Sequence, residues 1–355
     1  MKNKVINVCI IGGGNISNSR HIPALKKLKN VNIVGVMSKS QKSIDRTQAK
    51  HHFKHSMIIN NPKNDIKTLE KADWFKNVDA VVIGVPPQQH YALVKMCLLL
   101  GKNVLVEKPM MMNKKECEEC IKLAKDKKLS FYVMHNFQYA NGMRKLTDII
   151  ESKKYGDIVS ITEMQFTNRD RRLPEWYNEL PLGLFYDEAA HFIYLLQKHC
   201  GKIKIDDAHA VYSKENEATP MTLTVNATAN KTPVTMLLNM NAPVCQWFYI
   251  VSFKKKIFLY DFFKDILVGI NTDNEHLSGD ILKNDLSFTF QYWGKFIANG
   301  FRMITGNLLY GHNIVLGSFI DSIRGEKPDS NIQATAGMET VITMNEIVEK
   351  VIKND

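Results

Sequence analysis

Two adjoining stretches near the N-terminus decide the fold: VINVCII at residues 5–11, and GGGNIS at residues 12–17. The first is an apolar run typical of a buried strand, and apolar residues at helical spacing follow over residues 19–29. A strand, a glycine turn and a helix in this order are the setting of a dinucleotide-binding fingerprint, here G-x-G-x-x-S. Gly12 permits the tight turn, and Gly14 lets the backbone approach a pyrophosphate at the helix N-terminus. We therefore expect Gly12, Gly14, Asn15 and Ile16 to bind a dinucleotide, with a plain glycine turn as the alternative.

Outward from this turn, short apolar runs alternate with helical patterns through about residue 134. The pattern predicts strands at 33–37, 80–85, 103–106 and 131–134, and helices at 91–100 and 113–128. Buried runs that alternate with helices are typical of a parallel, doubly wound sheet. The sequence therefore predicts a Rossmann dinucleotide-binding domain over residues 1–134.

The pattern changes in the remainder of the chain, residues 135–355. Helices are predicted at 141–152, 184–199 and 332–353, and alternating strands at 222–228, 234–240 and 248–253. Alternation of apolar and polar residues is typical of an antiparallel sheet with one covered face. We predict a substrate-binding and oligomerisation domain here, whose last helix could pack back on the first domain. The aromatic and glycine-rich stretch 286–311 has no predicted structure; a subunit interface is its simplest interpretation, and a partner or membrane surface is an alternative.

Composition excludes several classes of protein. The chain has 355 residues, of which 45% are hydrophobic and 23% charged, an ordinary globular composition that argues against disorder. No apolar run is long enough to span a bilayer, and the apolar run at the N-terminus is too short for a signal peptide. We therefore predict a cytoplasmic protein without a membrane span.

The formal net charge is +11, which makes nucleic acid the first partner to consider. The lysines and arginines are spread along the chain, however, and no nucleic-acid-binding motif accompanies them. A lysine-rich solvated surface is the first interpretation and attraction of anionic small ligands the second, so we expect no nucleic-acid partner. Cys117 and Cys120 form a CxxC pair, but no second pair accompanies it, and we predict no metal site.

The end of the second predicted strand bears on the choice between NAD and NADP. An acidic residue there would bind the ribose 2′-hydroxyl and repel a 2′-phosphate. The chain instead has Ser38, Lys39 and Ser40, with no carboxylate until Asp45. The sequence therefore favours NADP(H), with NAD(H) as the alternative, although a Ser/Lys turn is also a common solvated loop.

Four further motifs give the chain a resemblance to a known family. They are VPPQQH at residues 85–90, EKP at 107–109, G-x3-D-x3-H from Gly183 to His191, and IRGEKP at 323–328. In order and spacing they resemble the glucose–fructose oxidoreductase/inositol dehydrogenase family (Gfo/Idh/MocA) along nearly the whole chain. The resemblance implies a Rossmann domain followed by an α/β domain with a large, mostly antiparallel sheet. It also implies NAD(P)-dependent hydride transfer on a sugar, cyclitol or related polyol.

The resemblance also implies roles for particular residues. Lys108 corresponds to the catalytic-site lysine and His191 to the acid/base histidine, with Asp187 as its partner. Histidine titrates near neutrality and suits proton transfer, while a lysine ammonium would stabilise a developing alkoxide. Asp187 and His191 are four residues apart, so on one helix they would share a face and could pair. Without the resemblance, an ordinary surface pair would be the better interpretation. By the same resemblance Glu107 lies near the nicotinamide, and the cofactor cleft is lined by Pro86, Pro87 and His90.

Candidate substrate contacts are Asn136, Arg169 and Tyr186. Arg169 opens the cluster RDRR at residues 169–172, which could clamp a phosphate or carboxylate or could tie a loop to the neighbouring domain. The chain departs from the family pattern at Gln138, where family members often carry arginine, and at Glu188, where a small residue is usual. Both departures bear on the substrate more than on the chemistry.

The sequence thus predicts an NAD(P)-dependent oxidoreductase acting on a sugar, cyclitol or nucleotide-linked sugar, with a small and possibly anionic substrate. An NAD-dependent glycosidase with tightly bound cofactor and a non-catalytic cofactor-binding regulator are the alternatives. We expect a homodimer or homotetramer.

Overall fold

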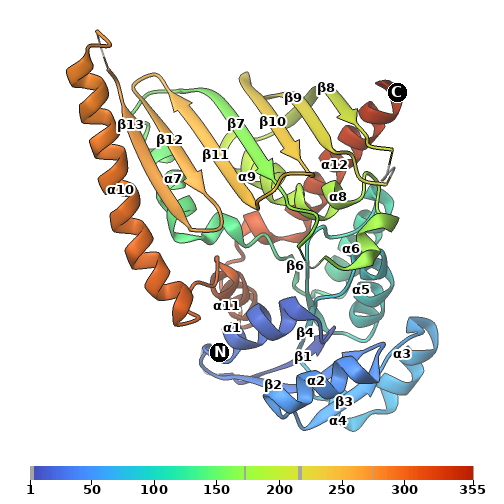
Figure 1. Ribbon diagram of the computed structural model, residues 1–355. Coiled ribbons are helices and arrows are strands. Elements are labelled where there is room, and N and C mark those ends of the chain that lie inside the picture. The colour runs from blue at the N-terminus through green and yellow to red at the C-terminus, as the bar shows by residue number, and fades with distance from the viewer. Residues whose placement is uncertain (1–3, 172, 215–217, 274, 355) are drawn as a thin grey trace. The chain divides into compact units, whose positions relative to one another are not determined.

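The computed structural model describes residues 4–171, 173–214, 218–273 and 275–354 (Figure 1). The chain divides into two compact units: Met1–Asn136 with Gly311–Ile342, and Phe137–Tyr310 with Thr343–Asp355. The sequence-based division placed residues 135–355 together, whereas Gly311–Ile342 belongs to the first unit.

The sheet of the first unit is parallel throughout the described residues. Its strands are β1 (Ile6–Ile11), β2 (Val31–Ser38), β3 (His55–Ile58), β4 (Ala80–Ile83), β5 (Asn103–Val106) and β6 (Phe131–Val133). Their order is β3-β2-β1-β4-β5-β6, the strand order of dinucleotide-binding doubly wound sheets. The central strands are almost fully buried, as the continuous apolar runs predict for a sheet covered on both faces. The Rossmann prediction is confirmed.

Helices connect these strands, and their ends follow local chemistry. Asn113 caps α6 by accepting a hydrogen bond from the Glu116 backbone N–H at 3.0 Å, and Ser40 caps α2 in the same way. The helices of this unit are η1 (Ser17–His21), α1 (Ile22–Leu25), α2 (Gln41–His51), α3 (Pro62–Lys71), α4 (Asp73–Lys76), η2 (Pro87–Gln89), α5 (His90–Leu99), α6 (Lys114–Asp126), α11 (His312–Ile323) and η5 (Ser330–Ile332). α12 (Ala334–Asn354) runs through both units.

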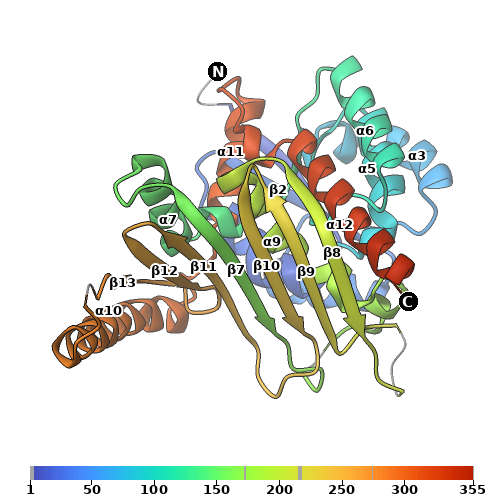
Figure 2. The same ribbon diagram turned by 90° about the horizontal axis from the view of Figure 1, so that it is seen from above.

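The second unit is built on a larger sheet (Figure 2). Its strands are β7 (Ile158–Phe166), β8 (Ile203–Val211), β9 (Thr222–Ala229), β10 (Thr232–Asn239), β11 (Gln246–Phe253), β12 (Lys256–Asp261) and β13 (Ile266–Asn271). Their order is β13-β12-β11-β7-β10-β9-β8, and every pair is antiparallel except β7 with β10. Burial alternates strictly along β11, which has one face toward the helices. The predicted large, mostly antiparallel sheet is confirmed.

The helices of the second unit include two that differ from the sequence prediction. The single helix predicted at 184–199 is two segments, α8 (Leu184–Glu188) and α9 (Ala190–Cys200), which meet at Ala189. The stretch without a prediction contains most of α10 (Ser278–Ile304), a long helix whose apolar side chains are mainly exposed. The others are η3 (Phe137–Tyr139), α7 (Asn141–Ser152) and η4 (Glu175–Glu179). None of the helices in the described residues combines the length and apolarity that crossing a membrane would need.

Candidate functional site

Each of the three glycines in the turn after β1 has different surroundings. Gly12 has φ +99°, and a Cβ there would lie 2.3 Å from the Gly84 carbonyl oxygen. A Cβ at Gly13 would collide with the Thr47 and Ser43 hydroxyls of α2. At Gly14, by contrast, the nearest atom among the described residues would be 4.0 Å away. Gly12 and Gly13 are therefore required by packing, while Gly14 leaves open space of the kind a bound phosphate needs.

Ser17 takes the third position of the fingerprint, where glycine usually allows close contact between helix and strand. The Ser17 side chain is fully buried, and the space that it occupies is provided by the strand side of the contact between helix and strand. A Cβ at Gly84, just after β4, would lie only 2.8 Å from the Ser17 hydroxyl oxygen. A glycine on the strand therefore replaces the missing glycine on the helix.

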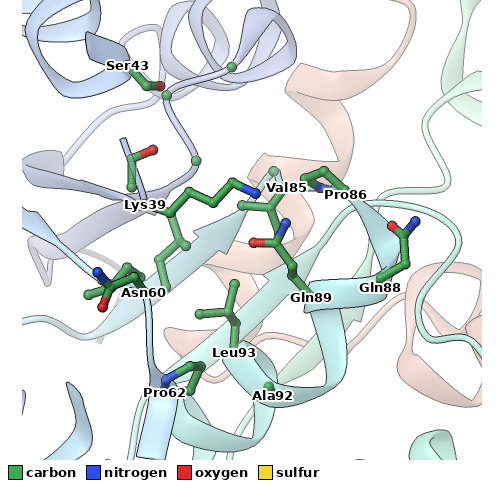
Figure 3. Close-up of a pocket in the computed structure, with 17 residues that line it drawn as sticks. Lys39, Ser43, Asn60, Pro62, Val85, Pro86, Gln88, Gln89, Ala92 and Leu93 are labelled. Carbon is green, nitrogen blue, oxygen red and sulfur yellow. The ribbon is translucent and has the colours of Figure 1, made fainter. Parts of the chain in front are cut away.

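A pocket of about 500 Å³ opens in front of this turn (Figure 3). Among the predicted cofactor residues, Gly12, Gly14, Ser38, Lys39 and Pro86 line it, while Asn15, Ile16, Pro87, His90 and Glu107 are not among its lining residues. Figure 3 shows the Lys39 side chain extending across the pocket rather than out of it. Asn60, Gln88 and Gln89 add amide groups to the lining, and no cofactor contact was predicted for them, although the two glutamines belong to the VPPQQH motif.

Glu107 lies in a buried cluster with two histidines. His21 Nε2 is 2.7 Å from Glu107 Oε1, and the rings of His21 and His312 are 6.0 Å apart. Burial would raise the pKa of Glu107, but the hydrogen bond from His21 and the positive charges of His21, His312 and Lys108 outweigh it and hold the pKa at about 2. Glu107 is thus a carboxylate, and its side chain also accepts a hydrogen bond from the Lys108 backbone N–H at 3.2 Å.

This cluster is also where a metal ion could be held in the described part of the chain. The ligand atoms of His21, Glu107 and His312 lie within 4.8 Å of one another, and all three side chains are buried. The sequence analysis identified neither histidine. The sequence contains a weak indication of a role for His21, because His21 lies four residues after Ser17 and therefore on the same helix face. The sequence contains no such indication for His312. It lies near Glu107 only because the chain returns to the first unit from residue 311 onward.

His90 joins the two loops that flank β4 and β5. One ring nitrogen, Nε2, is 2.9 Å from the Val85 carbonyl oxygen, and Nδ1 is 2.9 Å from that of Pro109. Burial lowers the pKa of His90, although both carbonyl contacts favour its protonated form. The ring therefore links the VPPQQH turn to the turn that contains Lys108, which itself is half-buried.

His191 lies in the second unit, at the start of α9, and is almost fully buried. Its Nδ1 is 2.9 Å from the Tyr194 hydroxyl oxygen, which also accepts the Phe137 backbone N–H at 3.0 Å. The ring of Phe137 contacts the imidazole edge to face at 4.8 Å, and the ring of Trp247 is 6.0 Å away. This aromatic setting fixes the orientation of the imidazole.

The other predicted catalytic and substrate residues differ in exposure. Asp187 is half-buried in α8, one turn before His191. Tyr186 is fully buried, and its hydroxyl donates to Asn345 Oδ1 on α12 at 2.8 Å. Asn136 is buried and is the last residue of the first stretch of the first unit.

The Arg169 guanidinium donates hydrogen bonds to backbone carbonyl groups of its own unit. It donates to the carbonyl oxygens of Met240, Thr219 and Pro220 at 2.8–2.9 Å. These bonds tie the arginine loop to its own unit, and the predicted tie to a neighbouring domain is not among them. Arg172, which the sequence analysis included in that cluster, lies outside the described residues.

Arg171 makes an ion pair with the buried carboxylate of Glu188. Gln165 and Thr167 on and after β7 also donate to Glu188, and the Trp247 indole N–H reaches the Thr167 hydroxyl at 3.4 Å. Glu188, which the sequence analysis noted as a departure from the family pattern, is therefore the centre of a buried polar network.

The fold and the glycine turn define a protein with an NAD-binding Rossmann domain. Residues 6–135 match the family described as the Gfo/Idh/MocA oxidoreductase family, NAD-binding Rossmann fold. The match lies within the first stretch of the first unit and agrees with the resemblance drawn from the motifs.

Curated relatives are distant and match part of the chain. An oxidoreductase from Formosa agariphila, P35, is 27% identical over 208 residues, which cover 56% of this chain and 62% of the relative. The scyllo-inositol 2-dehydrogenase (NADP(+)) of Bacillus subtilis is 24% identical, over 60% of this chain and 57% of its own. The chain thus spans about half to three fifths of the length of these relatives.

Solved structures extend the likeness to the whole fold. The WlbA dehydrogenase from Bordetella pertussis, solved in complex with NADH and UDP-GlcNAcA, aligns with a TM-score of 0.77 at 15% identity. The alignment covers 99% of this chain and 97% of that one. The second unit therefore shares the architecture of that protein as well.

Proposed function

We propose that this protein is an NAD(P)-dependent dehydrogenase or reductase. It transfers a hydride between a nicotinamide cofactor and a secondary alcohol or ketone of a sugar, cyclitol or nucleotide-linked sugar. The observation that carries the proposal is the turn after β1, where Gly14 opens on a pocket of about 500 Å³ beside β4. The names of the inositol dehydrogenase and of the WlbA complex with a nucleotide sugar support the substrate class.

The cofactor is held by the first unit. Gly14, Asn15 and Ile16 present backbone N–H groups to the pyrophosphate at the start of η1. Gly12 shapes the turn, and its own N–H donates to the Met37 carbonyl oxygen at 2.8 Å. Ser38 and Lys39 lie at the end of β2, where the adenosine ribose binds in this fold, and Lys39 reaches across the pocket. An ammonium at that place favours a 2′-phosphate, which supports NADP(H) as the preferred cofactor and NAD(H) as the weaker one. When bound, the nicotinamide supplies the hydride donor or acceptor.

The residues of this chain move the proton. Lys108 stabilises the developing alkoxide of the substrate, because an ammonium interacts more strongly with an alkoxide than with a hydroxyl. His191 takes the hydroxyl proton during oxidation and returns it during reduction. Asp187 stabilises the protonated imidazole. Glu107, His90, Pro86 and Pro87 shape the loops beside the nicotinamide, and Asn136 and Tyr186 contribute to the substrate side.

Arg169 has the least support as a substrate contact, because backbone carbonyls already accept its hydrogen bonds. Removal of Arg169 is therefore expected to act on the stability of the second unit more than on substrate affinity.

The first experiment identifies the substrate. Purified protein is assayed with a panel of sugars, cyclitols and nucleotide sugars in the presence of NAD or NADP, and the absorbance of the reduced cofactor is followed. Formation of reduced cofactor in proportion to substrate supports a dehydrogenase. Cleavage of a glycoside without net reduction would indicate the glycosidase. Binding of cofactor with no turnover over the panel in either direction would favour a regulator.

The second experiment tests the proposed roles. Lys108→Ala and His191→Ala should each lower kcat by roughly 10²–10⁴-fold, the range for loss of an oxyanion donor or a general base. Lys115→Ala and His209→Ala, at exposed positions, are the matched controls and should leave kcat unchanged. Cofactor affinity should survive both changes. A near-normal kcat in the His191 variant would transfer the acid/base role to another group, with Tyr186, Lys108 and Glu188 next to be tested.

A further inference from the structure

Helix α10 lies along the edge strand β13 of the second sheet (Figures 1 and 2). It contacts that strand through polar side chains. Asn284 donates to the Asn271 carbonyl oxygen at 3.2 Å, and Asn299 donates to that of Asp265 at 2.8 Å. Gln291 both accepts from the Gly269 N–H and donates to its carbonyl oxygen, and Lys295 donates to the Leu267 carbonyl oxygen.

These bonds explain why the polar side of the helix faces the protein. The backbone groups involved belong to residues 267, 269 and 271, every second residue of β13, and to residue 265 just before the strand. Alternate residues of an edge strand direct their backbone N–H and C=O groups away from the sheet, where they lack a partner strand. The polar stripe of α10 supplies those partners, so the helix closes the edge of the sheet.

As a result, the apolar face of α10 is turned outward. Seven large apolar side chains on it are between 55% and 88% exposed: Leu282, Leu286, Phe290, Trp293, Ile297, Phe301 and Ile304. Their spacings are 4, 4, 3, 4, 4 and 3 residues, an 11-residue repeat. A repeat of 3.67 residues per turn is close to the 3.6 of the helix, so the stripe stays on one side over about six turns.

We propose that this stripe is an interface between two copies of this chain, with the two α10 helices packed antiparallel about a two-fold axis at Trp293. Trp293 is the midpoint of the stripe, since Leu282 and Ile304 lie 11 residues to either side. At roughly 100 Å² for each of seven side chains, each copy would bury about 700 Å², near the 800 Å² per partner of a stable interface. The inference does not rest on the proposed reaction.

The charges beside the stripe match an antiparallel pair. Asp280 and Asp285, with the exposed Lys283 between them, lie in the first turns of α10, and the exposed Arg302 lies in its last turn. A two-fold axis at Trp293 places Asp285 of one copy beside the partner position of residue 301, next to the second Arg302. A helix lying on a membrane would instead carry lysine and arginine along its polar face, whereas here that face binds β13.

Two glycines give a further reason for close contact. Gly294 and Gly300 lie inside α10, where glycine destabilises a helix by about 1 kcal/mol relative to alanine. A Cβ at either position would have no atom within 4 Å among the described residues, so the fold of this chain does not require glycine there. Gly294 adjoins Trp293, and its lack of a side chain would let the second helix approach the backbone.

The test measures the oligomeric state of the full chain by sedimentation velocity over a range of concentrations. The parent protein should dimerise, and Trp293→Glu should weaken dimerisation by at least about 30-fold, the size expected at an aromatic hot spot. Val244→Glu, at a 58% exposed residue away from α10, is the matched control and should not change dimerisation. A monomeric parent protein, or dimerisation that Trp293→Glu leaves unchanged, would overturn the proposal.

Charge exchange tests the antiparallel orientation. Asp285→Arg and Arg302→Asp should each weaken dimerisation, and the double variant should recover most of the loss. Failure of the double variant to recover would contradict the antiparallel pairing. Co-sedimentation of a monomeric parent protein with phosphatidylcholine–phosphatidylglycerol vesicles, abolished by Trp293→Glu, would overturn the proposal in favour of a membrane surface.

Discussion

Two buried glutamates show how local environment decides the charge of one residue type. Glu107 is surrounded by His21, His312 and Lys108, and its pKa is held at about 2. Glu163, in the middle of β7, has no hydrogen-bond partner for either carboxylate oxygen among the described residues. Burial alone raises the pKa of Glu163 well above its usual range. Glu107 is therefore ionised over the whole physiological pH range. Glu163, in contrast, stays protonated at pH values well above the usual pKa of a glutamate.

Replacement of Glu163 by glutamine should change the pH dependence of stability. Because the pKa of Glu163 is raised on folding, the folded chain binds a proton that the unfolded chain has lost above pH 4.5. Stability therefore falls as pH rises between 4.5 and the raised pKa, by about 1.4 kcal/mol per pH unit for one proton. Glu163→Gln keeps the shape of the side chain and removes this loss. Its thermal midpoint should rise relative to that of the parent protein as pH increases from 5 to 8.

The control for this prediction is Glu179→Gln, at an exposed position of the same unit. The thermal midpoint of this control variant should change with pH in the same way as that of the parent protein between pH 5 and 8. Parallel pH profiles for the Glu163 variant and the parent protein would show that Glu163 is not a buried, proton-binding group in solution.

At the scale of elements, we propose that the loop from β2 to α2 governs the choice of cofactor. β2 ends at Ser38, and the side chain of the next residue, Lys39, crosses the pocket. An ammonium there can make a charge-assisted hydrogen bond to a 2′-phosphate, which a 2′-hydroxyl cannot match. On this proposal, the preference between NAD and NADP is set at the end of a strand, and no proposed catalytic residue takes part in it.

Lys39→Asp should weaken NADP binding by about 1.5–3 kcal/mol, the contribution of a hydrogen bond to a charged group. NAD binding should change little or improve, because a carboxylate at this place can accept the ribose hydroxyls. The dissociation constants of both cofactors are measured by calorimetry, with the exposed Lys42→Asp as the charge-matched control. Equal weakening of both cofactors would mean that Lys39 does not contact the 2′ position.

At the scale of the whole molecule, the first unit is assembled from two distant stretches of chain. α11 belongs to it although it begins at residue 312, and the ring of Phe319 packs on that of Tyr132 at 5.5 Å. His312 on the same helix completes the cluster around Glu107. The return of Gly311–Ile342 therefore contributes to both the core and the candidate site.

Phe319→Ala tests this contribution. The side chain is fully buried, so its loss should lower the free energy of unfolding by about 3–5 kcal/mol. Leu99→Ala, at a 44% exposed residue of the same unit, should cost no more than about 0.5 kcal/mol. Urea unfolding followed by circular dichroism measures both. A loss for Phe319→Ala as small as that of the control would mean that α11 is not part of the folded first unit.

Local pattern predicted the elements whose signal is local. The glycine turn, the strand at 103–106 and the capped helix α6 were predicted within one or two residues, because burial and capping act on neighbouring residues there. The short edge strand β3 was missed because only alternate residues of its four are partly buried. α10 was missed because its pattern is inverted, with the polar side inward and the apolar side exposed.

The sequence by itself determined the family resemblance, the order of the two architectures and the position of the glycine turn. These depend on residue types at short spacing, such as Gly12 to Ser17, which constrain the backbone directly. Only the tertiary structure revealed that Gly84 makes room for Ser17 and that His21 and His312 flank Glu107. It also showed that α10 closes the edge of a sheet. Each of these features joins residues far apart in the chain, and such contacts are selected by the packing of the whole unit rather than by the local sequence.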